Sequence, residues 1–187
     1  ILFVRAFKRR IWLGHKTFGP LPGRVTSCDI TSAKFRETGM TTNNPGQMRY
    51  SMFSVCDHYP NMPRSGNDLL EQLLQEIVLA EELGFNAYLV AELPFHEYGL
   101  VSNPAPFLSA AAQRTSKIRL GPGISVLPFR NPFQVAEDYA LVDRLSNGRL
   151  IMGVGSGYLK HEYEGFAVDP ADKRAVSYTH LTLPTKR

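Results

Sequence analysis

The stretch VAELPFHEYG, residues 90–99, places several proton-transferring side chains directly after an apolar run. Glu92 ends the run, and His96, Glu97 and Tyr98 follow shortly after it. Carboxylates and imidazoles are the side chains that most often donate or remove protons in active sites. These residues therefore predict general acid–base chemistry, provided that the apolar run is a strand that ends at the working face of the fold.

The glycine-rich stretch GVGSGY, with Gly153, Gly155 and Gly157, is a second candidate. The dinucleotide-binding fingerprint places its third glycine three residues after the second, so the shorter gap here argues against a Rossmann nucleotide site. Ser156 is also wrongly placed for a nucleophile elbow. We expect these glycines to let backbone or a flat ligand approach closely.

The triplet His-Glu-Tyr occurs twice, at 96–98 and 161–163. No HExxH motif or paired Cys/His spacing accompanies it, so no metal site is predicted. Both triplets are expected in solvated loops, with His96 the better functional candidate because its loop leaves a strand.

Cys56 follows another apolar run and is expected to be an inert, partly buried thiol. With Cys28 as the second of only two cysteines, a reduced, cytoplasmic setting is the default.

Strand-like and helix-like segments alternate from Met48 onward. Short apolar runs predict strands at 49–56, 86–91, 118–128 and 149–155, with helices of three- and four-residue hydrophobic spacing between them. Each strand-plus-helix unit takes about thirty residues, the size of a βαβ unit. The alternation predicts parallel strands covered by helices, either in an open doubly wound sheet or in a closed eight-stranded barrel.

Residues with known capping roles mark the helix ends. Asp68 and Glu71 have capping-box spacing ahead of the first helix, and Gly84 is placed to end it. Asn131 is placed to cap the third helix, which Gly148 follows.

In both architectures the reactive rim lies outside the carboxyl ends of the strands. Four segments should therefore meet at one rim: 56–58, 92–98, 127–130 and 155–158.

The net charge of +4 is concentrated at the ends of the chain. Residues 1–39 carry 8 basic and 2 acidic side chains, whereas residues 40–174 have a net charge of −4. A basic patch indicates nucleic-acid binding only when a fold organises it, so no nucleic-acid partner is predicted. No apolar run approaches the length of a membrane span, so no membrane segment is predicted either.

Both ends are interpreted as foreign to the domain. Residues 1–39 show no regular hydrophobic period and are predicted to be a non-native or disordered basic leader, with Met40 and Met48 as possible starts. Residues 176–186, VSYTHLTLPTK, resemble the translation of a sequencing adapter. Residues 175–187 are therefore predicted to be a tail outside the domain, the alternative being a short strand.

Residues 48–174 resemble the N-terminal half of the bacterial luciferase-like flavin-dependent monooxygenases. Five stretches in the same order carry the resemblance: AEELGFNAYLVAE, FHEYGLVSNP, TSKIRLGPGISVLPFRNP, AEDYALVDRLSNGRL and MGVGSGYLKHEYEGF. The resemblance implies a (β/α)8 TIM-type barrel, truncated here to about its first four strand–helix units. It also implies reduced FMN, or in some branches a deazaflavin, together with O2, a small organic substrate, a flavin reductase as partner, and a dimer.

The resemblance also assigns residues to the cofactor. It implies that the third strand runs beside the flavin ring, with a non-proline cis peptide at Gly123-Ile124. At the tip of the fourth strand, Gly155 would leave room for oxygen or substrate near the reactive edge of the flavin. We therefore expect two groups of cofactor-binding residues, one on each side of the ring: Gly123, Ile124 and Ser125, and Gly155, Ser156 and Gly157.

One departure from the family pattern affects the catalytic residues. Family members commonly carry Glu-His-His-Phe where this chain has Glu92-Leu93-Pro94-Phe95, and the first of those histidines is the one usually credited with acid–base work. Leu93 cannot transfer a proton. Glu92 and the 96–98 loop would line the substrate side, and His96 would compensate for Leu93 if its loop folds differently.

The predicted function is a flavin-dependent monooxygenase for the parent protein. The family's flavin phosphate is held chiefly by later strands, which this chain lacks, so the chain itself is expected to have little activity. A non-enzymatic, self-associating half-barrel module is the alternative from another class. Within the enzymes, a deazaflavin-dependent dehydrogenase remains open.

Overall fold

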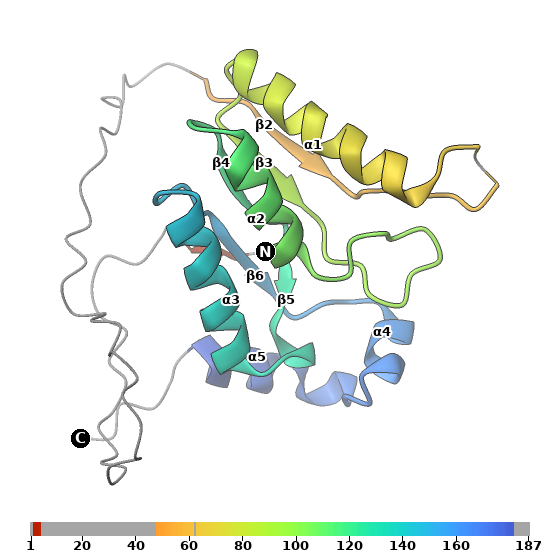
Figure 1. Cartoon of the computed structure of the whole chain (residues 1–187). Coiled ribbons are helices and arrows are strands. Elements are labelled where there is room, and N and C mark those ends of the chain that lie inside the picture. The colour runs from red at the N-terminus through yellow and green to blue at the C-terminus, as the bar shows by residue number, and fades with distance from the viewer. Residues whose placement is uncertain (1, 5–47, 62, 182–187) are drawn as a thin grey trace, which may run out of the picture. The chain divides into compact units, whose positions relative to one another are not determined.

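The computed structural model describes residues 2–4, 48–61 and 63–181 of the chain (Figure 1). The predicted leader therefore lies outside the described residues, except for strand β1 (Leu2–Val4). This strand pairs antiparallel with strand β6 (Met152–Gly155). Every other strand pairing described here is parallel.

Parallel strands form the centre of the fold, as the alternating pattern predicts. One sheet consists of three strands in the order of the chain: β2 (Ser51–Ser54), β3 (Ala87–Val90) and β4 (Arg119–Pro122). Strand β5 (Ser125–Val126) pairs with β6. A parallel bridge between Leu120 and Leu150 connects the two groups.

The third predicted strand, 118–128, is not continuous. Its first part is β4, which pairs with β3, and its second part is β5, which pairs with β6. The change of partner falls at the cis peptide Gly123-Ile124. Beyond β5 the chain turns into a short 3-10 helix, η2 (Leu127–Phe129), which ends the extended backbone earlier than predicted.

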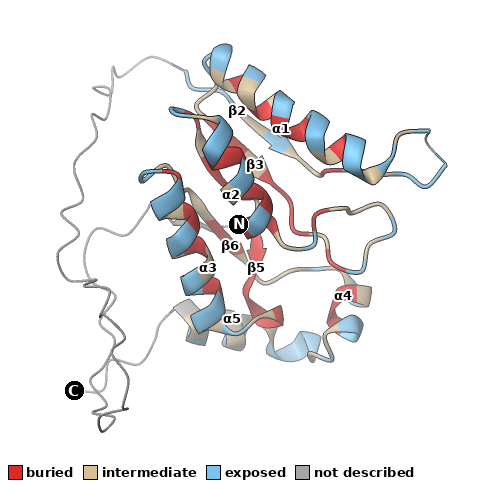
Figure 2. Cartoon of the chain, in the orientation of Figure 1, coloured by how far each residue is buried: buried red, intermediate tan, exposed pale blue. Residues whose placement is uncertain are grey.

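Three helices pack side by side along the outside of the strands, as Figure 1 shows: α1 (Gly66–Glu82), α2 (Pro104–Arg114) and α3 (Pro132–Leu145). Their buried faces turn towards the strands and their exposed faces turn away (Figure 2). Ile77, Leu108 and Val142, one from each helix, are fully buried against β-strand residues such as Tyr88 and Leu120. The main core therefore lies between the helices and the outer face of the sheet.

The predicted caps are confirmed for α3 but not for the start of α1. Asn131 accepts a hydrogen bond from the backbone N–H of Phe133 at 2.9 Å. Helix α1 begins earlier than the Asp68/Glu71 spacing predicts, because Ser65 is its N-cap. The Ser65 hydroxyl accepts from the Asp68 N–H and donates to the Asp68 carboxylate. Asp68 is therefore the third residue of the helix. A carboxylate at this position stabilises the helix, because it lies near the positive end of the helix dipole.

Three shorter helical segments follow β6: α4 (Lys160–Gly165), η3 (Pro170–Asp172) and α5 (Lys173–Leu181). Helix α5 covers the first residues of the predicted tail, so that segment is helical and not a strand. A ring nitrogen of His180, Nδ1, lies 3.2 Å from the carbonyl oxygen of Leu127, which places α5 beside η2. The proposed foreign origin of this tail stays a prediction.

Candidate functional site

The loops that leave the carboxyl ends of β2 and β3 lie side by side. Asp57 and Gly99 form an isolated antiparallel bridge, and the His58 N–H donates to the Tyr98 carbonyl at 2.7 Å. Cys56 is buried at the base of these loops, and its burial raises the thiol pKa to about 11. A thiol of this kind is a weak nucleophile, which agrees with the predicted inert role.

Glu92 lies at the end of β3 with a side chain that is only 5% exposed. Its Oε2 accepts a hydrogen bond from the Val126 N–H at 3.3 Å, which ties the end of β3 to β5. Burial raises the pKa of Glu92 to about 7, although the nearby Arg130 charge opposes the shift. Its carboxyl group can therefore hold or release a proton near neutral pH.

Two buried hydroxyl groups accompany this carboxyl group. Ser125 on β5 and Tyr139 on α3 are both buried, and neither hydroxyl makes a hydrogen bond of good geometry within the described residues, although Ser125 lies close enough to lower the pKa of both Glu92 and Tyr139. Burial raises the pKa of Tyr139, and the Glu92 charge adds to the increase. Buried polar atoms without partners are uncommon, and they occur where a ligand or water completes the site. Ser125 was predicted from the resemblance, whereas Tyr139 was not predicted, because it stands on the apolar face of its helix.

The predicted cofactor strand has the expected cis peptide at Gly123-Ile124. A Cβ added at Gly123 would lie 3.0 Å from Cε2 of Phe53, so the absence of a side chain lets the Phe53 ring approach the strand. A Cβ at Gly155 would collide with the Ile124 side chain. The space beside Gly155 is therefore occupied by Ile124 in this structure, and its use by oxygen or substrate stays a prediction.

The two remaining residues of the glycine-rich stretch lie next to β5 and α4. Gly157 has a φ of +75°, a conformation that favours glycine, and an added Cβ would lie 2.8 Å from Cγ1 of Val126. The carbonyl oxygen of Ser156 accepts a hydrogen bond from the Tyr163 hydroxyl. This backbone segment is therefore anchored to α4 on one side and to β5 on the other.

The two His-Glu-Tyr triplets meet at the rim. The ring centroids of His96 and His161 are 4.9 Å apart in an edge-to-face arrangement, and Tyr98 packs on His96 with centroids 4.0 Å apart. The prediction that both triplets are solvated is wrong for the second, because Glu162 and Tyr163 are each only 2% exposed. Their burial follows from helix α4, which the sequence pattern did not predict and which turns these side chains inward.

Leu93, which stands where the family commonly has a histidine, has no proton-transferring group. Its N–H donates to the Val101 carbonyl at 3.3 Å, and its Cβ packs beneath the backbone of Gly99. His96 is the nearest imidazole along the chain, and His161 lies against it. The structure therefore brings two imidazoles, one from the 96–98 loop and one from helix α4, to the part of the rim next to Leu93.

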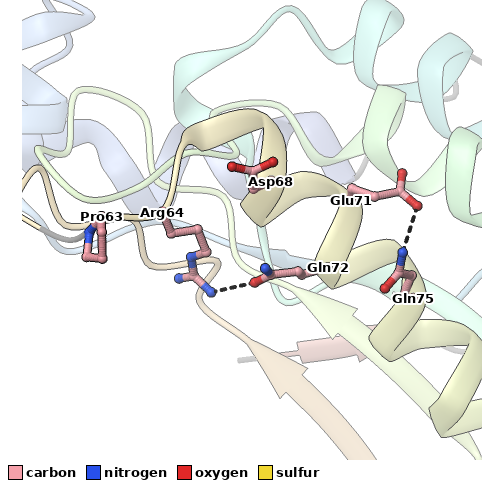
Figure 3. Close-up of a pocket in the computed structure, with 6 residues that line it drawn as sticks. All are labelled: Pro63, Arg64, Asp68, Glu71, Gln72 and Gln75. Atoms are coloured by element: carbon pink, nitrogen blue, oxygen red, sulfur yellow. Dashed lines mark hydrogen bonds between the residues drawn. The ribbon is translucent and has the colours of Figure 1, made fainter.

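A surface hollow of about 510 Å³ lies outside this rim, along the first turns of α1 (Figure 3). Hydrogen bonds from Arg64 to Gln72 and from Gln75 to Glu71 occupy its polar side chains. None of the predicted site residues lines it: its walls are Pro63, Arg64, Asp68, Glu71, Gln72 and Gln75. We assign it no function.

Two further findings concern only the described part of the chain. No three His, Cys, Asp or Glu side chains there are grouped so as to hold a metal ion. None of the helices in that part has the length and apolar character needed to cross a membrane.

Parallel strands with acid–base side chains at their carboxyl ends define an α/β domain of the enzyme type. A family model described as luciferase-like monooxygenase matches residues 48–177. The chain belongs to the luciferase-like monooxygenase family. The match covers the whole of the strand–helix repeat described above.

Individual relatives agree with this assignment. Limonene 1,2-monooxygenase of Rhodococcus erythropolis is 38% identical over 133 residues, which are 71% of this chain and 34% of the relative. The crystal structure of monooxygenase RslO1 from Streptomyces bottropensis has a TM-score of 0.68 at 32% identity and covers 72% of this chain and 41% of that one. The chain thus spans about a third of the length of the curated relatives it matches.

A more distant likeness concerns the fold alone. The oxygenating constituent of 3,6-diketocamphane monooxygenase from Pseudomonas putida, solved in complex with FMN, has a TM-score of 0.65 at 20% identity. The match covers 72% of this chain and 37% of that protein.

Proposed function

We propose that this chain carries the first four strand–helix units of a (β/α)8 barrel whose parent protein is a flavin-dependent monooxygenase. Family membership over residues 48–177 supports the enzyme class. The single observation that carries the site is the buried Glu92 carboxyl group at the end of β3, which accepts a hydrogen bond from the Val126 N–H of β5, the strand along which the resemblance implies the flavin ring. The substrate is a small organic molecule.

The residues along the Gly123 to Ser125 segment fit the ring portion of a flavin. The Phe53 ring and the backbone at Gly123 offer a flat, largely apolar surface, and the buried hydroxyl of Ser125 lies near Glu92 and Tyr139 without a hydrogen bond of good geometry within the described residues. When bound, reduced FMN would supply the electrons that activate O2, and a flavin reductase would supply the reduced cofactor. A deazaflavin has the same flat ring system and is the alternative cofactor.

The chain's own residues would position the ring and move protons. Gly123, Ile124 and Ser125 would lie along one face of the ring, and the 155–157 segment would lie on the other side. Glu92 would hold a proton at its carboxyl group, since its pKa is about 7. His96 would contact the substrate in place of the histidine that Leu93 replaces.

Flavin titration tests this proposal. The purified 187-residue chain should quench the fluorescence of added FMN in a saturable manner, and Gly123→Val should weaken that binding because a larger side chain collides with Phe53. If later strands hold the phosphate, riboflavin should bind about as tightly as FMN, and turnover with a reductase and O2 should be slight. An unchanged fluorescence on titration would refute the flavin site, and tighter binding of a 5-deazaflavin would favour the alternative cofactor.

A second candidate function is a non-enzymatic module that self-associates. The specific observation that favours it is the exposure of apolar side chains on and beside β2, among them Met48, Tyr50 and Phe53. Strand β2 pairs with β3 on one side, and no other described strand pairs with its second edge. Unpaired edges invite association with another chain.

A further inference from the structure

His96 and His161 form a pair of contacting imidazoles at the rim. The proposed function gives a role to His96 but none to His161. Each imidazole has one nitrogen, Nδ1 of His96 and Nε2 of His161, that is buried without a hydrogen-bond partner. The two rings are in contact, with centroids 4.9 Å apart. Leaving a buried polar atom without a partner is unfavourable, and each of the two contacting rings carries one such atom.

The other two histidines of the described residues each have a ring nitrogen within hydrogen-bond distance of a backbone carbonyl oxygen. Nε2 of His58 lies 3.0 Å from the Arg64 carbonyl oxygen, and Nδ1 of His180 lies 3.2 Å from that of Leu127. Both rings therefore have a backbone partner. The His96 and His161 nitrogens lack one, although both side chains lie in ordered contact with their neighbours.

Metal binding does not explain the pair. Within the described residues no third His, Cys, Asp or Glu side chain joins the two imidazoles in a metal-binding group. Glu162 is the next residue to His161, and its buried Oε1 also lacks a partner. Burial raises the pKa of this carboxyl group to about 7, and its charge adds to the raised pKa of Glu92.

An aromatic ring packs on the histidine pair, and a group of stacked phenylalanines begins at the residue before His96. Tyr98 packs against His96, and Phe95 meets Phe166 with ring centroids 5.0 Å apart. Phe166 in turn stacks on Phe129 at 4.8 Å. The Tyr98 ring beside His96 suits the body of a cyclic or aromatic ligand, because aromatic rings favour stacked or edge-to-face contact.

We propose that His96 and His161 together bind the hydroxyl group of a cyclic alcohol or phenol, one ring donating a hydrogen bond to its oxygen and the other accepting its hydrogen. A neutral imidazole has one donor nitrogen and one acceptor nitrogen, so a pair can present one of each. A hydroxyl group both donates and accepts and thus complements such a pair. A ketone lacks the hydrogen, and a carboxylate needs two donors.

If the proposed monooxygenase function holds, the histidine pair makes hydroxylated ring compounds the substrate class. That consequence rests on the proposed function. The hydroxyl would be held at the rim on the side of Leu93, where the usual histidine is missing. His96 and His161 are binding residues in this scheme. No bond is made or broken at the pair.

The test follows the histidine ring signals of the full 187-residue chain by NMR during titration with phenol at about pH 8, where a free imidazole is neutral. Toluene and benzoate, titrated separately, are the apolar and the anionic analogues. We expect saturable shifts of the His96 and His161 signals with phenol, and weaker binding of both analogues. The His58 and His180 signals are internal controls and should not move, because their rings already have partners.

The variant His161→Phe keeps an aromatic ring against His96 but removes the hydrogen-bonding nitrogen. We expect it to weaken phenol binding about fivefold to tenfold and to leave toluene binding unchanged. Equal binding of toluene and phenol to the wild-type chain would overturn the proposal, as would tighter binding of benzoate. The wild-type series decides the matter even if the variant does not fold.

The two proposals fail separately in this design, because no flavin is present in the NMR experiment. A chain that binds phenol at the histidine pair but does not quench FMN would refute the flavin site alone. A chain that quenches FMN but shows no phenol-dependent shift would refute the hydroxyl site alone.

Discussion

At the scale of single residues, Glu92 is the best example of a side chain whose burial changes its chemistry. Only 5% of it is exposed, and a single backbone N–H donates to its carboxylate. The charged form is therefore poorly compensated, which raises the pKa to about 7. Because the folded-state pKa lies above that of the unfolded chain, Glu92 stabilises the fold below about pH 4.5, and this contribution is lost as the pH rises through 7.

Replacing Glu92 by Gln should remove that pH dependence. The amide is neutral at every pH, and its oxygen can still accept from the Val126 N–H. Compared with the wild type, E92Q should gain about 2–3 kcal/mol in the free energy of unfolding between pH 4.5 and pH 8, as urea denaturation at both values would measure. The matched control is Glu164→Gln on the exposed side of α4, which should follow the wild-type profile. Parallel profiles for E92Q and the wild type would contradict the prediction.

At the scale of elements, a carboxylate holds the turn between α2 and β4. Glu81, near the end of α1, accepts hydrogen bonds from the backbone N–H groups of Ser116, Lys117 and Ile118 at 2.6–3.0 Å. Partial burial would raise its pKa, but the three N–H donors outweigh that effect and lower it. The contribution to stability is therefore present above the carboxylate's ordinary pKa and is lost as the pH falls through the folded-state value.

Substitution of Glu81 by Ala should destabilise the fold by about 1–3 kcal/mol at neutral pH, because it leaves three turn N–H groups without their acceptor. The control is Glu82→Ala at the neighbouring exposed residue. This substitution also removes a carboxylate, but one that accepts no hydrogen bond from the turn at 116–118. Urea denaturation at neutral pH should separate the two variants, and the difference should shrink at about pH 3. Equal stability of E81A and E82A at neutral pH would rule out this role.

Local patterns predicted the elements well, whereas contacts between distant segments escaped prediction. The caps at Asn131 and Gly148 are fixed by residues within one turn, so their types were sufficient evidence. The break at Gly123-Ile124 depends on which strands lie on either side, which no local pattern reveals. For the same reason the approach of His161 to His96, across more than sixty residues of chain, could not be seen in advance.

The site residues divide along the same line. Glu92 and Ser125 were proposed from their place at strand ends or from the resemblance, and both are buried there. Tyr139 was missed because a tyrosine on an apolar helix face is usually a core residue. The repetition of His-Glu-Tyr was the available signal for His161, but repetition alone does not indicate that two segments are neighbours.

At the scale of the whole molecule, helices cover the outer face of the described strands, whereas β2 at the edge of its sheet still exposes apolar surface. The helices cover the outer face of the strands, and Figure 2 shows their buried residues turned inward. On β2, however, Phe53 remains 55% exposed although it packs over Gly123. An exposed aromatic side chain on a strand with an unpaired edge favours association with a second chain.

Replacing Phe53 by Lys should therefore reduce self-association of the chain. A charged side chain on β2 opposes strand pairing and removes apolar surface that a partner would cover. Phe133→Lys on α3 is the matched control, because Phe133 is also 55% exposed but lies on a helix. Sedimentation velocity over a range of concentrations should show a larger monomer fraction for F53K than for the wild type or F133K. If both variants dissociate equally, general surface hydrophobicity, and not the β2 edge, drives the association.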